Sequence, residues 1–261
     1  MSLLLLKLLL TPSLIGLASL AGRRWGHAIS GWIVALPLTT GPIVFFLALT
    51  HGAAFAAETA AGILAGGLSL AAFTMAYARF ALAWSWLPTL AAASATFFAM
   101  TLLLRSVHLP LVPLWAAVLA AFWLSLRILP RGSTESPAPE SLPGRWDIPL
   151  RMIIATAFVF LITGLASTVG PHLAGLLSPF PIFTSVMAAF AQHQSGAAAA
   201  ISVLRGLLLG LFSYASFMFI LALLLMPAGV PAAFAAAILV VIVIQAAALR
   251  LVRDGVGRMP A

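Results

Sequence analysis

Long apolar runs, separated by short polar interruptions, fill most of the chain. Most runs reach about 18 to 25 residues, which is the length that an α-helix needs to cross a bilayer and is too long for a barrel strand. They lack the strict alternation of a half-buried strand. Because only helices and closed barrels satisfy all backbone polar groups in lipid, the pattern predicts an all-α, polytopic membrane protein. About nine spans are predicted, at residues 3–21, 31–50, 54–78, 82–104, 110–129, 148–168, 173–192, 197–225 and 230–250.

The composition agrees with lipid as the solvent. Apolar residues make up 63% of the chain and charged residues 7%, whereas a soluble domain has about 25% charged residues. The net charge of +8 could suit nucleic acid, but the basic residues lie at the ends of predicted spans, where charge orients a membrane protein. Nucleic acid is therefore not an expected partner. The chain has no cysteine, which excludes disulfides and thiolate metal sites.

Arginines follow the first, third, fifth and ninth predicted spans, and these ends share one side of the membrane. The positive-inside rule places that side in the cytoplasm. We therefore expect a multi-pass protein of a bacterial inner membrane, with its N-terminus outside and its C-terminus cytoplasmic. Arg105 lies on the opposite side in this scheme. The longest polar stretch, 130–146, is rich in proline and serine and is expected to form a flexible loop between two halves.

The two halves match each other at a constant offset of 144 residues, the separation between Pro37 and Pro181. Identities other than alanine and leucine recur along one ungapped stretch, where about one or two would arise by chance. The matched pairs are Gly31 with Gly175, Pro37 with Pro181, Thr40 with Thr184, Phe46 with Phe190, Gly52 with Gly196, Gly62 with Gly206, Gly66 with Gly210, Ser69 with Ser213, and Phe73 with Phe217. The two Gly-x-x-x-Gly pairs among them are typical of closely packed membrane helices.

A unit of four spans returns the chain to its starting side, and a fifth span then carries it across. The second unit should therefore begin on the opposite face. We expect two inverted four-helix repeats, at 1–104 and 148–261, joined by residues 105–147, which hold a linking transmembrane helix and the polar cytoplasmic loop. Inverted repeats are typical of secondary transporters, in which one half rocks against the other.

Several small and apolar motifs in the second half carry a family resemblance. They are Ala174-Gly175-Leu176, Phe180-Pro181-Ile182-Phe183, Gly196 with the alanine run after it, and Pro231-Ala232-Ala233-Phe234. Through them, residues 148–250 resemble the GlpM family of small four-helix bacterial inner-membrane proteins. The first half is similar more weakly, with Leu36 in the place of Phe180. The resemblance implies two fused units joined by an extra helix. The family's link by name to glycerol metabolism and exopolysaccharide production implies no substrate.

Prolines interrupt predicted spans two and seven at matching depth. A proline inside a helix removes a hydrogen bond and frees backbone groups, and nearby hydroxyls could then complete a polar site at mid-membrane. Paired interruptions of this kind point to the binding site of a transporter. The alternative is a pair of kinked structural helices. The predicted substrate-binding residues are Pro37, Thr39, Thr40, Pro179, Pro181, Thr184, Ser185 and Arg205.

Two charged residues stand apart in the apolar chain. Glu58 is the only acid outside the loop and the termini, and Arg205 is the only base well inside a predicted span. An intramembrane charge indicates function by default, so Glu58 is predicted to couple transport to an ion and Arg205 to bind an anion. At 1.5 Å per residue, about 13 Å would separate their α-carbons along the membrane normal, which argues against an ion pair. The alternatives are an interfacial or capping role for Glu58, and bonds to helix carbonyls or snorkelling for Arg205.

The leading hypothesis is a secondary transporter of a small polar or anionic solute. The sequence contains no phosphate-binding loop, nucleophile elbow, paired-carboxylate site or metal-ligand spacing, so neither an enzyme nor a cofactor is expected. The expected partners are the lipid bilayer and a small-molecule or ion substrate, and the protein is expected to be a monomer or homodimer. Two alternatives stay open: a non-transporting assembly or regulatory subunit for polysaccharide or lipid export, and a lipid flippase.

Overall fold

The computed structural model describes residues 40–107, 109–130 and 178–257, together with residues 9, 12–13, 16–17, 19–20, 24–25, 32, 37, 148–150, 152–153 and 157. The helices in these ranges are α3 (Thr40–His51), α4 (Ala53–Ala81), α5 (Trp86–Leu104), α6 (Leu111–Ile128) and α9 (Ile182–Gly257). The all-α prediction is therefore confirmed for the described residues. Four of the helices, α4, α5, α6 and α9, are long and apolar enough to cross a membrane.

About nine spans were predicted, whereas four helices long enough to cross a membrane lie within the described residues. Predicted spans one and six, at 3–21 and 148–168, lie mostly outside the described residues, as does the polar stretch 130–146. Predicted spans two and seven are described only from Thr40 and from Ser178 onward, apart from Trp32 and Pro37. Within the described residues, α3 begins at Thr40 and α9 at Ile182, and Trp32 is also helical.

Two glycines bend α9 into three helical segments, 182–195, 197–228 and 230–257. Gly196 has φ 83° and ψ −179°, and Gly229 has φ 75° and ψ 170°. Positive φ combined with an extended ψ is a conformation that glycine adopts almost alone, because a Cβ atom would clash with the backbone. The first segment is therefore a short helix and the second a long one.

A third glycine makes the same kind of break between α3 and α4. Gly52 has φ 90° and ψ 165°, and it joins the 12-residue α3 to the 29-residue α4. Gly52 is the residue that matches Gly196 at the offset of 144. At this break both halves therefore share one design: a short helix, a glycine with positive φ, and a long helix.

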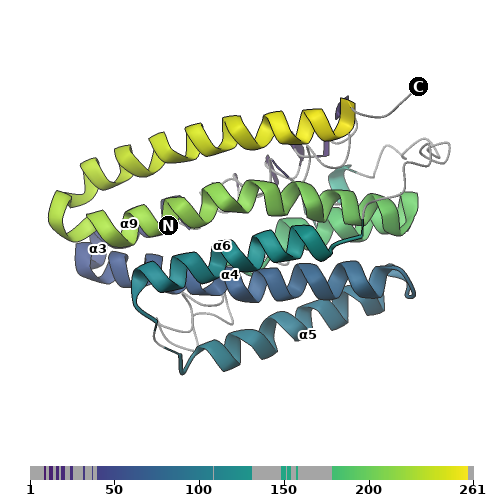
Figure 1. The fold of residues 1–261 in the computed structure, drawn as a ribbon, viewed down its shortest axis with the longest axis horizontal. Coiled ribbons are helices and arrows are strands. Elements are labelled where there is room, and N and C mark those ends of the chain that lie inside the picture. The colour runs from purple at the N-terminus through teal and green to yellow at the C-terminus, as the bar shows by residue number, and fades with distance from the viewer. Residues whose placement is uncertain are drawn as a thin grey trace.

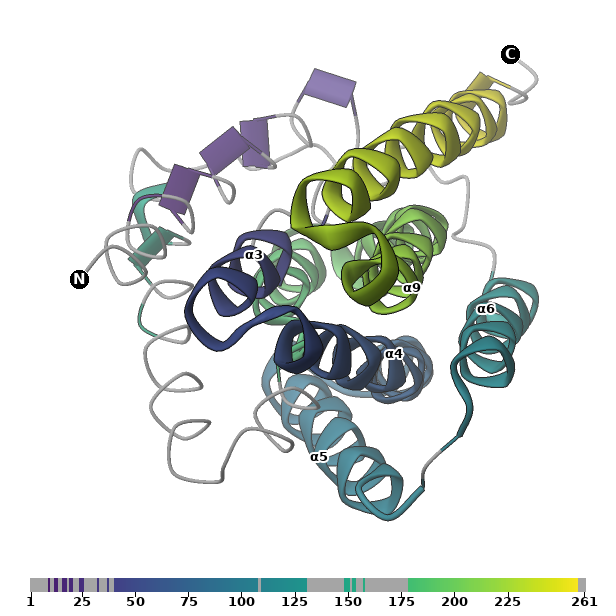
Figure 2. The same cartoon turned by 90° about the vertical axis from the view of Figure 1, so that its left-hand side faces the viewer.

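The two long helices, α4 and the segment 197–228 of α9, run antiparallel at the centre of the bundle. Gln192, just before the second of these helices, donates a hydrogen bond to the carbonyl of Trp84, just after the end of α4. The start of one long helix therefore lies beside the end of the other. Figures 1 and 2 show α5, α6, α3 and the last segment of α9 arranged around this pair.

Alanine, aromatic and aliphatic side chains fill the interior, and further large aliphatic side chains cover much of the outside. The core includes Ala56, Ala60, Phe73 and Phe97, each fully buried. The exposed side chains include Leu103, Leu124, Leu223, Ile238, Leu239, Ile242 and Val243. A surface of this kind matches lipid rather than water. The alanines among the buried residues are the small side chains expected where membrane spans pack closely.

Glycine also allows a close contact between two helices of the core. A Cβ atom added to Gly67 would lie 3.0 Å from Cγ1 of Val118 and 3.3 Å from Cζ of Phe122, both on α6. Gly66, Gly206 and Gly210 of the predicted Gly-x-x-x-Gly motifs are buried, and Gly62 is half-buried. The tight approach of α6 to α4 therefore depends on Gly67, the neighbour of the motif residue.

Candidate functional site

The first part of the candidate site is the N-terminus of α3. The amide of Gly41 donates a hydrogen bond of 2.9 Å to the carbonyl of Pro37, so the proline lies where the helix begins rather than inside it. Thr40 lies in the first turn and is 4% exposed. A Cβ atom on Gly41 would lie 3.4 Å from Cζ of Phe217 on α9. The start of α3 is therefore packed against the long segment of α9.

Two hydroxyl groups meet at this N-terminus. The side chain of Tyr214, from the segment 197–228, lies beside that of Thr40 and is 6% exposed. The two hydroxyls are close enough to interact with each other, although neither has a partner that meets strict hydrogen-bond geometry. A buried hydroxyl without a partner loses its bonds to water and gains nothing in return. The two hydroxyls form a polar contact between α3 and the long segment of α9.

The second part of the candidate site is the N-terminus of α9. The amide of Ser185 donates a hydrogen bond of 2.7 Å to the carbonyl of Pro181, which repeats the arrangement at Pro37. Pro179, Pro181, Thr184 and Ser185 are all buried. The hydroxyl of Ser185 is buried without a partner. Pro37 and Pro181 thus lie just before the described helices α3 and α9 and accept a hydrogen bond from their first turns.

The two short helices pack onto the opposite halves in a reciprocal way. The start of α3 touches Phe217 of α9. Phe180, next to Pro181 and just before α9, packs edge-to-face on Phe73 of α4, with the ring centroids 6.4 Å apart. Phe73 and Phe217 are equivalent at the offset of 144. Each short helix runs from the interior to one end of the bundle, so the two N-termini face inward from opposite ends (Figure 1).

The surroundings of the two N-termini differ in polarity. Phe180 lies in an aromatic cluster, with its ring centroid 5.1 Å from that of Phe97 and 5.2 Å from that of Phe98. At the α3 end, the equivalent of Phe180 is Leu36, and Tyr214 replaces the equivalent Leu70. The α3 end thus adds a tyrosine hydroxyl to its threonine, whereas the α9 end adds a phenylalanine cluster to its threonine and serine.

Arg205 lies at the C-terminal end of α6, away from the N-termini. Its Nη1 atom donates hydrogen bonds to the carbonyls of Leu129 at 3.1 Å and Leu126 at 3.4 Å. A guanidinium suits this place because the last carbonyls of a helix lack partners and carry partial negative charge. The geometry therefore matches the structural alternative for Arg205, in which it bonds the carbonyls of a helix end.

Glu58 lies near the opposite end of the bundle. It occupies the second turn of α4 and is exposed, whereas Arg205 is near the end of α6, on the side where α4 ends. The separate placement that the sequence indicated agrees with this arrangement. Thr39, the remaining predicted site residue, lies outside the described residues.

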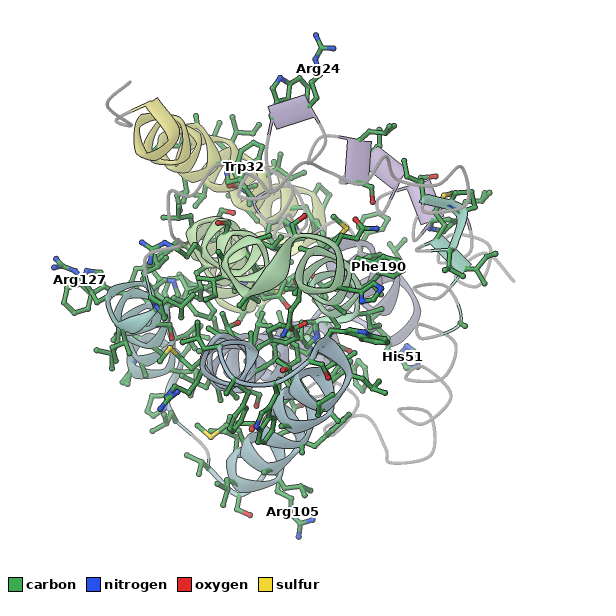
Figure 3. All side chains as sticks on the ribbon, turned by 90° about the vertical axis from the view of Figure 1, so that its right-hand side faces the viewer. Arg24, Trp32, His51, Arg105, Arg127 and Phe190 are labelled. Atoms are coloured by element: carbon green, nitrogen blue, oxygen red, sulfur yellow. The ribbon has the colours of Figure 1, made fainter. Side chains whose placement is uncertain are left out.

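Exposed charged and aromatic side chains mark the two ends of the described helices. At the end where α4 and α6 finish, Arg127 lies 4.8 Å above the ring of Trp123, and the imidazole of His193 is 6.0 Å from the ring of Trp86. At the other end His51 stacks on Phe55 at 5.0 Å. Figure 3 shows Arg105 and Arg127 pointing away from the bundle. Among the described residues no cluster of three metal-ligating side chains occurs.

The structure adds polar residues that the sequence pattern did not single out. Gln192 bonds the carbonyls of Trp84 at 2.8 Å and Ala81 at 3.4 Å, and Thr101 donates to Ser69 at 2.9 Å between α5 and α4. Tyr77 is fully buried with an unpartnered hydroxyl. A glutamine or a tyrosine in an apolar span must find a partner or remain costly, and that rule could have identified them.

Three comparisons with known proteins were negative. A scan against protein-family models finds no match, and searches of curated proteins and of solved structures find none either. The resemblance to the GlpM family therefore stays a hypothesis that rests on the quoted motifs.

Proposed function

We propose that this protein is a secondary transporter built from two inverted four-helix repeats, which moves a small polar or anionic solute by alternating access. The observation that carries the proposal is the matched pair of helix starts and breaks. Pro37 and Pro181 accept the first helical bond, and Gly52 and Gly196 share one rare backbone conformation. Short helices that begin inside a bundle at corresponding positions of two halves are a common design of transporter sites.

The antiparallel long helices support the inverted relation. If α4 and the segment 197–228 are equivalent, a pseudo-twofold axis lies between them, parallel to the membrane. The contacts of Gly41 with Phe217 and of Phe180 with Phe73 involve equivalent phenylalanines of the two long helices, and they support such an axis through different residues of the two short helices. Rocking of one half against the other would then expose the centre alternately to each side.

The solute site of this proposal lies between the two N-termini. Thr40 and Ser185 supply hydroxyls, and the first turns that follow Pro37 and Pro181 supply backbone N–H groups with partial positive charge. Such groups favour negative or hydrogen-bond-accepting atoms. Glu58 is assigned the ion-coupling role, at the exposed start of α4. Arg205 is assigned a positioning role at the end of α6.

The proposed location is a bacterial inner membrane, with the C-terminus in the cytoplasm and the N-terminus outside. Arg79 and Arg127 lie in the last turns of α4 and α6, which meet at one end of the bundle. The last segment of α9 runs toward the same end (Figure 1). The positive-inside rule makes this the cytoplasmic end.

The absence of native cysteine allows a direct test of the inverted relation. Ala54→Cys and Ala198→Cys place one thiol at each of two equivalent positions, at the starts of the two long helices. Labelling with a membrane-impermeant maleimide should reach them from opposite sides of the membrane. Labelling of both from one side would refute the inverted repeat.

Transport itself requires flux in proteoliposomes. Saturable uptake of a small polar or anionic solute should fall in Ser185→Ala and in Glu58→Gln, with Ser94→Ala on α5 as a matched hydroxyl control outside the site. Arg205→Ala should lower stability more than it changes selectivity, because its described bonds are to carbonyls. Wild-type uptake in both Ser185→Ala and Glu58→Gln would remove these residues from the mechanism.

The aromatic cluster around Phe180 favours a second candidate, a non-transporting assembly or regulatory subunit. A tightly packed aromatic centre suits a static scaffold, and four phenylalanine rings meet at this N-terminus. This candidate predicts stable copurification with another membrane protein and no flux by the isolated chain.

A further inference from the structure

We propose that Gln192 holds closed a polar route through the bundle, which runs between the segment 182–195 of α9 and the hairpin of α4 and α5. The route is lined by Ser185, Tyr77 and Thr89, and it leads to the end of the bundle where α4 finishes. This inference deepens the proposed function and rests on it for the role of the route in transport. The opening of the route can be measured without transport.

Two contacts set the segment 182–195 of α9 in register with the last part of α4. The ring of Phe180, just before α9, lies 6.4 Å from that of Phe73 on α4, and Gln192 bonds the carbonyl of Trp84. The first pair is 107 residues apart in the sequence and the second is 108 apart. The segment therefore runs parallel to the end of α4 at a nearly constant register.

Two further contacts set α5 antiparallel to the same segment. The ring of Phe97 lies 5.1 Å from that of Phe180, and the ring of Trp86 lies 6.0 Å from that of His193. Thr89, one turn after Trp86 on α5, therefore lies between these two contacts. The three helices thus enclose one column, which runs from the phenylalanine cluster to the end of the bundle.

Four polar atoms along this column are buried without a hydrogen-bond partner. They are the hydroxyls of Ser185, Tyr77 and Thr89 and the Oε1 atom of Gln192. The register of α9 on α4 places Ser185 level with Tyr77, and none of the four side chains is more than 8% exposed. A buried polar group without a partner has lost its bonds to water. Separation of the helices would let water or a polar solute bond all four atoms.

Gln192 opposes that separation. Its Nε2 atom donates hydrogen bonds to the carbonyls of Trp84 at 2.8 Å and Ala81 at 3.4 Å. These bonds fasten the segment 182–195 to the turn that joins α4 to α5. The groups behind Gln192 are uncharged and can each accept a hydrogen bond, and the three hydroxyls can also donate one. Such a lining suits a solute that carries hydrogen-bonding groups.

The other half of the chain has no counterpart of this column. At the offset of 144 residues, Gly41 is the equivalent of Ser185, Ala48 of Gln192, Leu221 of Tyr77 and Ala233 of Thr89. These four side chains contain no polar atom, so water gains no hydrogen bond to them when helices separate. The polar route and the residue that closes it are therefore expected at one end of the bundle only.

The absence of native cysteine lets a single introduced thiol report the opening. Ser185→Cys and Thr89→Cys each replace a hydroxyl of the route with a thiol. The protein in liposomes is treated with a positively charged, membrane-impermeant methanethiosulfonate reagent, applied to each side in turn. The rate of thiol modification is compared between Gln192 and Gln192→Leu, because leucine is of similar size and cannot donate a hydrogen bond. Modification of a buried thiol follows the population of the open form when opening is fast.

Gln192→Leu should raise the modification rate of both thiols about 5- to 100-fold, because the closed form loses two hydrogen bonds. The rise should occur from the side of the membrane at which α4 ends. Leu221→Cys is the matched control, since Leu221 is fully buried at the position equivalent to Tyr77, and its rate should stay the same. If Gln192→Leu does not fold, Gln192→Glu takes its place, since an ionised carboxylate also lacks a hydrogen to donate.

Two outcomes would overturn the inference. One is a rate at either Ser185→Cys or Thr89→Cys that does not change with Gln192→Leu. The other is an equal rise at Leu221→Cys, which would indicate general loosening of the bundle. A rise limited to the two route thiols in a protein without flux would support the route and count against the transporter proposal. Flux together with unchanged rates would support the transporter and count against the route.

Discussion

Replacing Gly196 with alanine is expected to destabilise the protein, and the sign of the effect is the informative part. Gly196 has φ 83° and ψ −179°, a region that is essentially limited to glycine. Holding alanine there costs about 1–3 kcal/mol. A Cβ atom at this position would meet nothing within 4 Å. The whole penalty therefore comes from the backbone and none from a steric clash.

A continuous helix through residue 196 would give the opposite result. Alanine is about 1 kcal/mol more favourable than glycine in a helix interior, so the variant would then be more stable than the wild type. The two outcomes differ by about 2–4 kcal/mol when these figures are combined. Equilibrium unfolding in mixed detergent, followed by tryptophan fluorescence and circular dichroism, would resolve that difference.

Gly52→Ala provides an internal repetition of the measurement. Its φ of 90° and its empty Cβ position match those of Gly196, so the loss should be similar and the two losses should add. Gly41→Ala is the control, because Gly41 has an ordinary helical backbone and its Cβ atom would lie 3.4 Å from Phe217. A stabilising effect at Gly52 or Gly196 would refute the helix breaks on which the repeat rests.

Three further substitutions test the packing and the helix ends. Gln192→Ala should lower the unfolding free energy by about 1–3 kcal/mol, because the carbonyl of Trp84 loses its donor; an unchanged value would mean that water replaces the amide. Gly67→Ala should cost about 1–3 kcal/mol through overpacking, since its Cβ atom would lie 3.0 Å from Val118, and Val118→Ala should recover part of that loss in a double-mutant cycle. Glu58→Gln should change stability by less than about 0.5 kcal/mol, as expected for an exposed residue, so a large loss would reveal a partner.

The sequence predicted the helical class, and it singled out Gly52 and Gly196, because both depend on local chemistry. Long apolar runs admit few structures in lipid, and Gly52 and Gly196 stand out against an alanine- and leucine-rich background. The same pattern could not tell a kinked helix from a helix that begins at proline, since Pro37 suits both. The backbone of the described residues favours the second reading at Pro37 and at Pro181.

Partners across the bundle were beyond the reach of the sequence. The acceptors of Arg205 are backbone carbonyls near the end of α6. Every residue has a carbonyl, so the sequence does not show which ones will accept this bond. The pairing of Thr40 with Tyr214 likewise depends on how α3 packs against α9. Tyr214 was visible only as a polar residue in an apolar span, so its neighbour required the tertiary structure.

The hydrogen bonds of Gln192 and Arg205 have a mechanical consequence. Both side chains come from α9, and they fasten the carbonyl ends of α4 and α6 at one end of the bundle. The residues 144 positions earlier are Ala48 and Ala61, which lie toward the opposite end and offer only methyl groups. Directional bonds resist separation sharply, whereas methyl contacts slide with little change in energy. Separation of the helices should therefore be easier at Ala48 and Ala61 than at Gln192 and Arg205.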